Sequence, residues 1–326
     1  MQPVNSIDLG LPDNKCFVIG EVAQAHDGSL GTAHAYIDAI AEAGADAVKF
    51  QTHIAAAEST LDEPWRVRFS RQDATRFDYW KRMEFSVEQW AGLVQHAREK
   101  KLMFLSSPFS VNAVDLLNDL GVPLWKPLLI SSGMSTLGDI DNVVSGCRSR
   151  HIPFGLFQCS SAYPCAPEQW GLRLMEILRE RYRCPVGLSD HSGGIYAGLA
   201  AATLRADFIE VHVTFDRGMF GPDVPASITV EELKKLVEGI RLIARSLQTG
   251  VDKDQLAEQT SPLKKIFGRS LALKTDLSGG TVLAREHLTL KKPGGGIPYT
   301  ELEALIGSTL RRDKSANRLL RKEDLE

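Results

Sequence analysis

The chain has 326 residues, of which 43% are hydrophobic, and a formal net charge of −3. This length allows one large domain and a small one, and the charge excludes a strongly basic nucleic-acid-binding surface. The five cysteines are scattered and never form CxxC, which argues against a disulfide framework or a structural zinc site. No apolar run approaches the roughly 20 residues of a membrane span, so we expect a reduced cytoplasmic protein that does not enter a membrane.

Short apolar runs alternate with longer amphipathic segments. The runs predict strands at residues 16–23, 46–52, 102–107, 122–126, 127–133, 152–161, 184–190 and 206–214. Apolar residues recur every three or four positions in seven other segments, which predicts helices at 32–46, 87–101, 111–121, 137–150, 166–182, 194–206 and 230–247. Ser135 or Thr136 can cap the fourth helix.

This alternation predicts a (β/α)₈ TIM barrel. The alternative is an open, doubly wound sheet. That fold would place a GxGxxG motif after the first strand, whereas the sequence there is GEVAQAHDG. After about residue 249 the pattern changes. We predict a barrel domain at 1–249, a polar linker at 250–265 and a small β-rich domain at 266–326 with short strand-like runs and Gly punctuation.

The predicted strands 122–126 and 127–133 follow each other without a connection, although neighbouring parallel strands need a crossover of about a dozen residues. Either the barrel is distorted at this point, or residues between Lys126 and Pro127 are missing from the sequence. We favour the second explanation, which predicts that Lys126 and Pro127 lie far apart.

Polar residues of one parity mark the ends of the predicted strands, where a barrel carries its active site. On this basis we expect the following side chains to share one rim: Glu21, Lys49, Gln51, Ser106, Ser107, Lys126, Ser189, His191, Glu210 and His212.

Two histidines at this rim suggest a metal site. His191 and His212, with Glu21 or Glu210 nearby, can hold one divalent cation and leave positions open for substrate. The alternative is that the histidines only form hydrogen bonds within a polar layer.

Other rim residues suggest an anionic substrate. Lys49 and Lys126 can bind a phosphate or carboxylate, helped by Ser107 and Ser189, or the lysines can form salt bridges across the rim. Asp223 lies on the loop after the last strand, where it is either catalytic or part of an Asx-turn. Tyr163 either lines the substrate site or packs before a proline turn.

Several stretches together resemble the sialic acid synthase family, which includes N-acetylneuraminate, legionaminate and pseudaminate synthases and the spore-coat polysaccharide protein E group. They are, in order, GEVAQAHDGSL, AGADAVKFQT, YWKRMEFSVEQW, FLSSPFS, ISSGMSTL, CSSAYPCAP, GLSDHSG, IEVHVTFDR, GPDVPAS and KKPGGGI. The resemblance implies a TIM barrel followed by a small antifreeze-like (SAF) domain, in a domain-swapped homodimer.

The resemblance also implies a reaction. The family condenses phosphoenolpyruvate with an N-acylated amino-sugar aldehyde, such as N-acetylmannosamine, using Mn²⁺ or Mg²⁺, and releases a nine-carbon 2-keto acid and phosphate. A metal on His191 and His212 would polarise the aldehyde, and Glu21 or Glu210 would help to activate water. Lys49, Lys126, Ser107 and Ser189 match the family's phosphoenolpyruvate-binding positions, and Gln51, Tyr163 and Asp223 match its sugar-binding positions.

The sequence departs from the family pattern at ligand sites. Ala162 replaces an asparagine that helps to bind phosphoenolpyruvate, Val224 replaces a histidine, and Lys292 replaces the arginine that reaches the sugar's acyl group from the partner chain. These changes resemble the spore-coat branch. The family also carries a KIASGE-like stretch and a helix where Lys126 meets Pro127. Two alternatives therefore stay open: an impaired homologue that binds sugar or phosphoenolpyruvate, and a 3-deoxy-keto-acid phosphate synthase.

Overall fold

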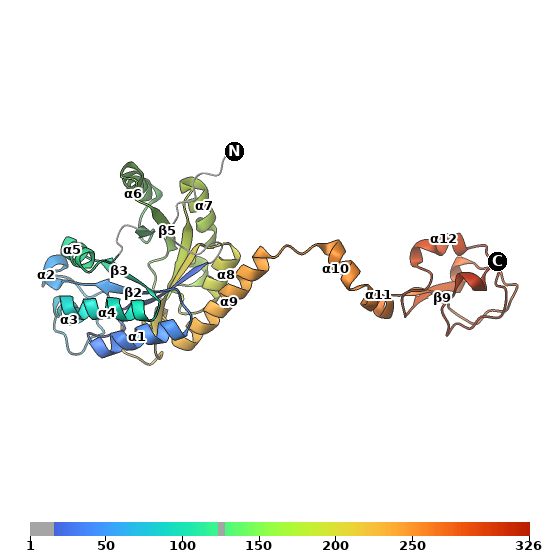
Figure 1. Cartoon of the computed structure of the whole chain (residues 1–326), viewed down its shortest axis with the longest axis horizontal. Helices are drawn as coiled ribbons and strands as arrows, with labels where there is room; N and C mark the ends of the chain where they lie inside the picture. The colour runs from blue at the N-terminus through green and yellow to red at the C-terminus, as the bar shows by residue number, and fades with distance from the viewer. Residues whose placement is uncertain (1–15, 123–127) are drawn as a thin grey trace. The chain divides into compact units, whose positions relative to one another are not determined.

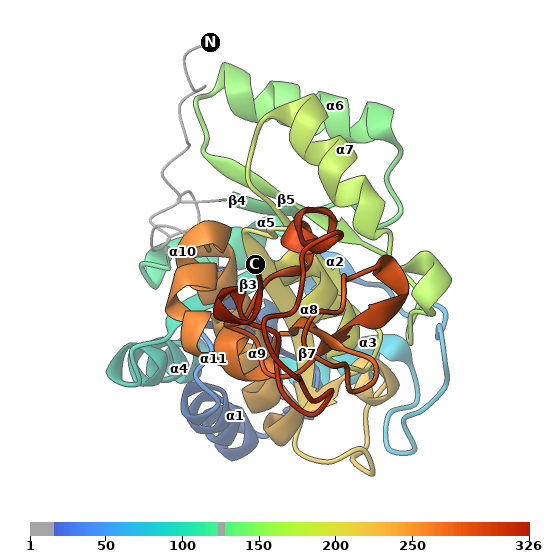
Figure 2. The same cartoon turned by 90° about the vertical axis from the view of Figure 1, so that its right-hand side faces the viewer.

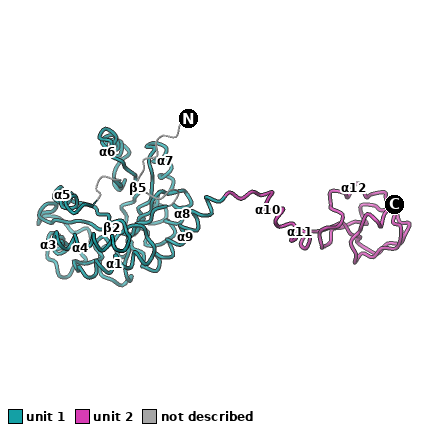
Figure 3. The backbone as a smooth tube through the Cα atoms, viewed as in Figure 1, with its two compact units in different colours: residues 1–249 teal, residues 250–326 magenta. Residues whose placement is uncertain are grey.

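The structure is a computed structural model that describes residues 16–122 and 128–326. The chain divides into two compact units, residues 1–249 and residues 250–326 (Figure 3). Each unit has its own hydrophobic core, and each is described here by itself.

Unit 1 is built around a parallel sheet (Figure 1). Its strands are β1 (Phe17–Ala23), β2 (Ala47–Thr52), β3 (Met103–Pro108), β4 (Leu128–Ser131), β5 (Phe154–Cys159), β6 (Val186–Asp190) and β7 (Phe208–Thr214), paired in the order β3-β2-β1-β7-β6-β5-β4. The short strand β8 (Ile228–Thr229) pairs with β7. Seven of the eight predicted strands are thus confirmed, in a TIM-like arrangement.

The predicted fourth strand falls almost entirely on residues 123–127. These positions, including Lys126 and Pro127, lie outside the described residues. The expected separation of Lys126 and Pro127 therefore stays a prediction.

Helices surround the sheet (Figure 2). All seven predicted helices are present, although the observed bounds are shorter at several ends. They are α1 (Leu30–Glu42), α4 (Val87–Glu99), α5 (Val111–Asp119), α6 (Leu137–Ser149), α7 (Leu172–Tyr182, after the 3₁₀ turn Pro167–Gln169), α8 (Tyr196–Thr203) and α9 (Val230–Gln248). Thr136 caps α6 in a capping box with Asp139, so the second of the two predicted caps is the one used.

Two further helices, α2 (Ala55–Glu58) and α3 (Arg76–Met83), lie between β2 and α4 and were not predicted. Thr75 caps α3 and forms a capping box with Asp78, a signal that is present in the sequence. The segment that carries these two helices forms one wall of a pocket at the rim of the sheet.

The side chains on one face of the sheet form two layers along the strands. An apolar layer comes first along the strands and consists of Phe17, Ile19, Ala47, Phe157 and Phe208. Because side chains alternate, residues two positions further along point to the same interior, and these are polar: Glu21, Lys49, Cys159 and Glu210. The apolar layer therefore lies beneath a polar layer, which is found at the C-terminal ends of the strands.

The ring of Phe208 fits this layer because two glycines face it. A Cβ atom on Gly187 would lie 2.1 Å from the Phe208 ring, and one on Gly155 would lie 2.7 Å from it. Phe208 also packs edge-on against Phe157, with ring centroids 4.6 Å apart. The two glycines thus leave room for the Phe208 ring, which lies in the apolar layer two positions before Glu210 on the same strand.

Unit 2 contains α10 (Lys253–Gln259) and α11 (Ser261–Phe267), an antiparallel pair of β9 (Ser270–Leu273) with β10 (Leu288–Lys291), and α12 (Leu302–Leu305). It also has 3₁₀ turns at Arg285–His287, Tyr299–Glu301 and Lys322–Asp324. The segment predicted as a polar linker forms α10 and most of α11. Among the described helices, none combines the length and the apolar character that crossing a membrane requires.

Candidate active site

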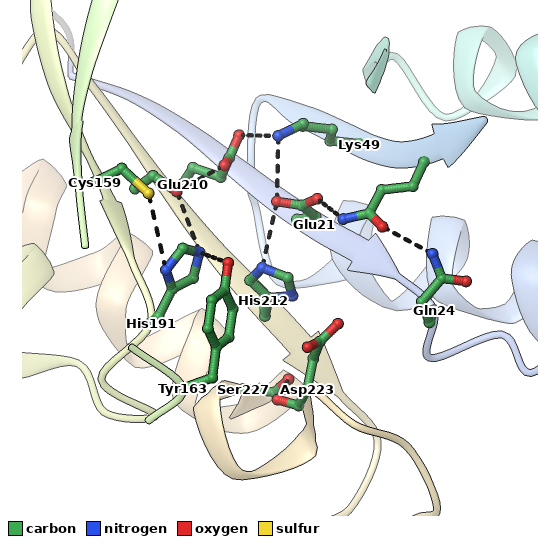
Figure 4. Close-up of polar contacts among 12 residues, drawn as sticks. Glu21, Gln24, Lys49, Cys159, Tyr163, His191, Glu210, His212, Asp223 and Ser227 are labelled. Carbon is green, nitrogen blue, oxygen red and sulfur yellow. Dashed lines mark hydrogen bonds and ion pairs between the residues drawn. The ribbon is translucent and has the colours of Figure 1, made fainter. Parts of the chain in front are cut away.

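The polar layer brings residues from adjacent strands side by side (Figure 4). In the strand register, Glu21 on β1 lies opposite both Lys49 on β2 and His212 on β7. Ser189 on β6 lies opposite Glu210 on β7. Parallel pairing at one height therefore explains why residues that are far apart in sequence meet at one rim.

Lys49 sits between two buried carboxyl groups. Its Nζ atom lies 2.8 Å from Glu210 Oε2 and 3.3 Å from Glu21 Oε2. Glu210 also accepts a hydrogen bond from Ser189 Oγ at 2.9 Å, and Glu21 accepts one from Gln51 Nε2 at 2.9 Å. The lysine and its neighbours thus compensate most of the charge that this site buries.

The two carboxyl groups differ in acidity. Burial opposes ionisation of both, but Lys49, His212 and the hydrogen bond from Gln51 outweigh burial at Glu21 and lower its pKa to about 2. Burial raises the pKa of Glu210, because Lys49 offsets it only in part and Glu21 repels a second negative charge. Burial also acts against the charged form of Lys49, yet the two glutamates keep its pKa above the usual value. The site thus favours ionisation of Glu21 over ionisation of Glu210.

Two histidines and a tyrosine form the other half of the layer. The rings of His191 and His212 lie 5.0 Å apart, and Tyr163 stacks on His191 at 4.1 Å. His191 Nδ1 donates to the carbonyl oxygen of Ser160 at 2.9 Å, so in the neutral ring Nε2 is the nitrogen without a proton. This Nε2 atom lies 3.1 Å from the Tyr163 hydroxyl oxygen. Burial and the neighbouring His212 lower the pKa of His191 to about 4, which leaves this imidazole neutral near pH 7.

These imidazoles fit a divalent cation as a pair of ligands. His191 has the arrangement typical of metal ligands, with one nitrogen bound to a carbonyl and the other free of a proton. Among the described residues, His212 Nδ1 is buried without a hydrogen-bond partner. Residues 16–122 and 128–326 contain no group of three or more His, Cys, Asp or Glu side chains that could hold a metal. Water or substrate would therefore have to supply the remaining ligands.

A pocket of about 350 Å³ opens above the polar layer. Arg66 spans one side of it, with its guanidinium 4.8 Å from the centre of the Tyr163 ring and one nitrogen 3.3 Å from Asp223 Oδ1. The pocket is lined by side chains from the β2–α4 segment, the sheet rim and the loop after β7: Gln24, Gln51, His53, Glu58, Glu63, Trp65, Arg66, Val67, Phe69, Arg76, Tyr79, Trp80, Phe109, Tyr163, His212, Pro222 and Asp223.

Most of the predicted site residues lie in this layer or in the pocket above it. They are Glu21, Lys49, Gln51, Tyr163, Ser189, His191, Glu210, His212 and Asp223. Ser107 is next to Gln51 in the strand register, whereas Ser106 hydrogen-bonds to Thr52 on the other parity. Lys126 lies outside the described residues. Lys292 belongs to unit 2, where its Nζ atom lies 5.7 Å from the centre of the Phe267 ring, so its predicted role stays a prediction.

The sequence reasoning missed several residues of the site. Gln24 Nε2 hydrogen-bonds to Gln51 Oε1, His53 Nε2 lies 3.4 Å from the same oxygen, and Glu58 hydrogen-bonds to His53. Cys159 Sγ lies 4.0 Å from His191 Nδ1. His53 lies two positions after Gln51, so the rule of alternation would have found it if it had been extended beyond the end of the strand.

Comparison with known proteins found two matching family models. The family model described as the NeuB family matches residues 36–127 and 124–252, and the SAF domain model matches residues 268–326. Together they cover most of the chain. The chain belongs to the NeuB family. The family match is made of two segments that meet at residues 124–127, where the sequence lacks a crossover.

Relatives of this NeuB-family chain are named as synthases of nonulosonic acids. It is 30% identical over 335 residues to the N,N'-diacetyllegionaminic acid synthase of Campylobacter jejuni. The aligned region covers 94% of this chain and 99% of the relative. A sialic acid synthetase structure from Leptospira borgpetersenii is 28% identical, with a TM-score of 0.65 over 77% of this chain and 91% of its own. A spore coat polysaccharide biosynthesis protein from Bacillus subtilis is 26% identical, with a TM-score of 0.62 over 97% and 96%. The chain is thus an enzyme of the nonulosonic acid synthase type.

Proposed function

We propose that this protein condenses phosphoenolpyruvate with an N-acylated amino-sugar aldehyde and releases a nine-carbon 2-keto sugar acid and phosphate. The network of Lys49 with Glu21 and Glu210 carries this proposal, because it provides one cation and two carboxyl groups of different acidity at the rim of the sheet. Groups whose environments separate their pKa values are typical of paired acid and base roles.

The chain's own residues can serve each stage of this reaction. C3 of phosphoenolpyruvate bonds to the aldehyde carbon, the aldehyde oxygen takes a proton, and positive charge develops at C2. The ionised Glu21 carboxylate would stabilise that charge and accept a proton from the water that adds at C2. Phosphate then leaves with the bridging oxygen, and the 2-keto group forms. Lys49 would bind an anionic group of phosphoenolpyruvate, and Glu210 would hold the proton that keeps the pair singly ionised.

We also propose that His191 and His212 hold Mn²⁺ or Mg²⁺. When bound, the cation would polarise the aldehyde carbonyl as a Lewis acid. The support is the unprotonated Nε2 of His191 and the unpartnered, buried Nδ1 of His212.

Phosphate release tests the proposed activity. With Mn²⁺ and phosphoenolpyruvate, we expect release that requires an N-acylated hexosamine such as N-acetylmannosamine and stops when the metal is chelated. Glucosamine without an acyl group and erythrose 4-phosphate serve as comparison substrates. Release only with erythrose 4-phosphate would favour a 3-deoxy-keto-acid phosphate synthase. No release with any acceptor would favour an impaired binding homologue, for which Ala162 is the supporting residue.

We propose further that the protein is a homodimer in which Lys292 of one chain serves the other chain's sugar site. The support is the resemblance of the KKPGGGI stretch to the family segment that reaches the partner. The expected mass in solution is twice the 35.9 kDa of one chain, measurable by light scattering. A mass of one chain at micromolar concentration would contradict this assembly.

A further inference from the structure

A second histidine–carboxylate pair lies in the outer half of the pocket. His53 Nδ1 is 2.6 Å from Glu58 Oε1, and the side chains are only 2% and 7% exposed. The His53 ring is clamped between Trp80 and Phe109, with ring centroids 4.2 and 4.5 Å away and planes within 16° of parallel. Aromatic stacking on both faces fixes the ring, so the position of the Glu58 carboxylate is fixed as well.

Hydrogen bonds connect this pair to the polar layer. Gln51 Nε2 donates to the Glu21 carboxylate, so the other end of the Gln51 amide, Oε1, must accept. Gln24 Nε2 supplies that hydrogen bond at 2.8 Å. The same Gln24 nitrogen lies 2.6 Å from His53 Nε2, which therefore accepts as well.

The direction of this chain of hydrogen bonds determines the tautomer of His53. An amide nitrogen can only donate, so His53 Nε2 carries no proton, and Nδ1–H donates to Glu58. Rotating the Gln24 amide would place its oxygen against Gln51 Oε1, which would bring two acceptors together. The arrangement that satisfies the Glu21 carboxylate is therefore the one that directs the His53 proton toward Glu58.

Two acceptor atoms of this hydrogen-bonded chain have no donor. Among the described residues, Glu58 Oε2 and Gln24 Oε1 are buried side-chain atoms with no hydrogen-bond partner, and both residues line the pocket. Buried acceptors without partners are costly unless a ligand provides donors. This part of the pocket is thus complementary to hydroxyl or N–H groups and repels an added anion.

We propose that Glu58, held by His53, is a specificity-determining residue that accepts a hydrogen bond from a hydroxyl or acylamino N–H of a non-phosphorylated amino sugar. This inference rests on the proposed function and deepens it. The two arginines of the pocket do not offset the acidic character, because Arg66 is paired with Asp223 and Arg76 with Glu63. A sugar phosphate would have to break one of these pairs, whereas a neutral sugar would not.

The test compares Glu58→Gln with Glu84→Gln. Glutamine at 58 can still accept from His53 through one oxygen, but it presents an amide donor where the sugar donor would sit. Glu84 Oε1 accepts from the backbone N–H of Ala55 at 2.8 Å and so supports the same short helix without lining the pocket, and glutamine preserves that hydrogen bond. The control thus separates support of α2 from contact with substrate.

The KM values and the preference between the neutral sugar and its 6-phosphate test the role of Glu58. We expect Glu58→Gln to raise KM for N-acetylmannosamine about 10- to 100-fold, with KM for phosphoenolpyruvate changed less than about 3-fold, and Glu84→Gln to match the wild type. The wild type should prefer N-acetylmannosamine to its 6-phosphate, and Glu58→Gln should narrow that preference. An unchanged sugar KM, equal losses for both substrates, or a wild type that prefers the phosphate would overturn the inference.

Calorimetric binding of N-acetylmannosamine and its 6-phosphate gives a readout that needs no turnover. Wild type that binds the neutral sugar without turning it over contradicts the proposed function, while a weaker affinity of Glu58→Gln would still support the role of Glu58. Equal affinity of wild type and variant, or no binding of the sugar to the wild type, would overturn that role. Stabilisation of both variants by phosphoenolpyruvate in thermal unfolding confirms that they are folded.

Discussion

Replacing Lys49 by methionine is expected to lower the free energy of unfolding by about 3–5 kcal/mol near pH 7 and to reduce phosphate release at least about 100-fold. Lys49 is the cation within 3.3 Å of both Glu21 and Glu210, and the carboxyl groups are almost fully buried. Methionine matches the lysine side chain as far as Cε and removes the charged amino group, so both carboxyl groups lose their main compensation. Urea unfolding and the phosphate assay measure the two effects.

The loss of stability should depend on pH in a definite direction. In the wild type the pKa of Glu21 is about 2, below its usual 4.5, so this group stabilises the fold above about pH 4.5 and loses that contribution as the pH falls toward 2. Without Lys49 the folded pKa values of both carboxyl groups rise. A group with a raised folded pKa stabilises at low pH and loses this contribution as the pH increases, so the deficit of Lys49→Met should be largest at neutral pH and should shrink as the pH falls toward 2.

Two further variants separate charge compensation from other effects. Lys49→Met combined with Glu210→Gln removes one of the two buried ionisable carboxyl groups and should recover part of the stability but none of the activity. Lys100 pairs with Asp38 at 2.6 Å on the surface, where both side chains are more than 40% exposed. Lys100→Met should therefore leave unfolding nearly unchanged. A deficit of Lys49→Met that is the same at pH 4 and pH 7 would contradict the proposed role of the two carboxyl groups.

The rim of the sheet could be predicted from sequence because two simple regularities act there. Side chains of a strand alternate, and a barrel gathers the C-terminal ends of its parallel strands. Glu21, Lys49 and His212 were therefore expected at one rim, and the register places them at one height. Neither regularity depends on the detailed packing of side chains.

The pocket wall depends on packing and could not be derived in the same way. His53 is fixed by Trp80 from α3 and Phe109 from the segment after β3, and no periodicity relates these three positions. Likewise Gln24 follows the end of β1, so its contact with Gln51 depends on how the turn after the strand folds. The wall of the pocket thus depends on contacts between loops, whereas the polar layer depends on the sheet.

The two helices α10 and α11 in the predicted linker were missed for a different reason. Asp252 caps α10 by accepting from the backbone N–H groups of Asp254 and Gln255, and Pro262 stands in the first turn of α11. Both are ordinary helix-start signals. The polar composition of the segment concealed them, because most residues of the two helices are exposed and give no apolar periodicity.

Removing either histidine of the pair is expected to weaken Mn²⁺ binding at least about 100-fold, because each bond to the ion requires a lone pair at about 2 Å. His191 offers Nε2, since its Nδ1 proton is engaged by the Ser160 carbonyl, and His212 offers the buried Nδ1 that has no partner among the described residues. In His191→Asn the amide can still donate to Ser160, so the loop after β6 should keep its anchor while the ligand is lost. Free Mn²⁺ measured by electron paramagnetic resonance reports binding without reference to turnover.

A third histidine provides the matched control. His151 is exposed and has a backbone φ of 55°, a left-handed conformation that asparagine tolerates better than most residues. His151→Asn should bind Mn²⁺ like the wild type and release phosphate at the same rate, whereas His191→Asn and His212→Asn should lose both properties. If both of the latter variants bind Mn²⁺ at full strength, the histidines serve only the polar layer. Their T-shaped contact and the stacking of Tyr163 would then be packing features, and the cation required by the assay would have to be held elsewhere.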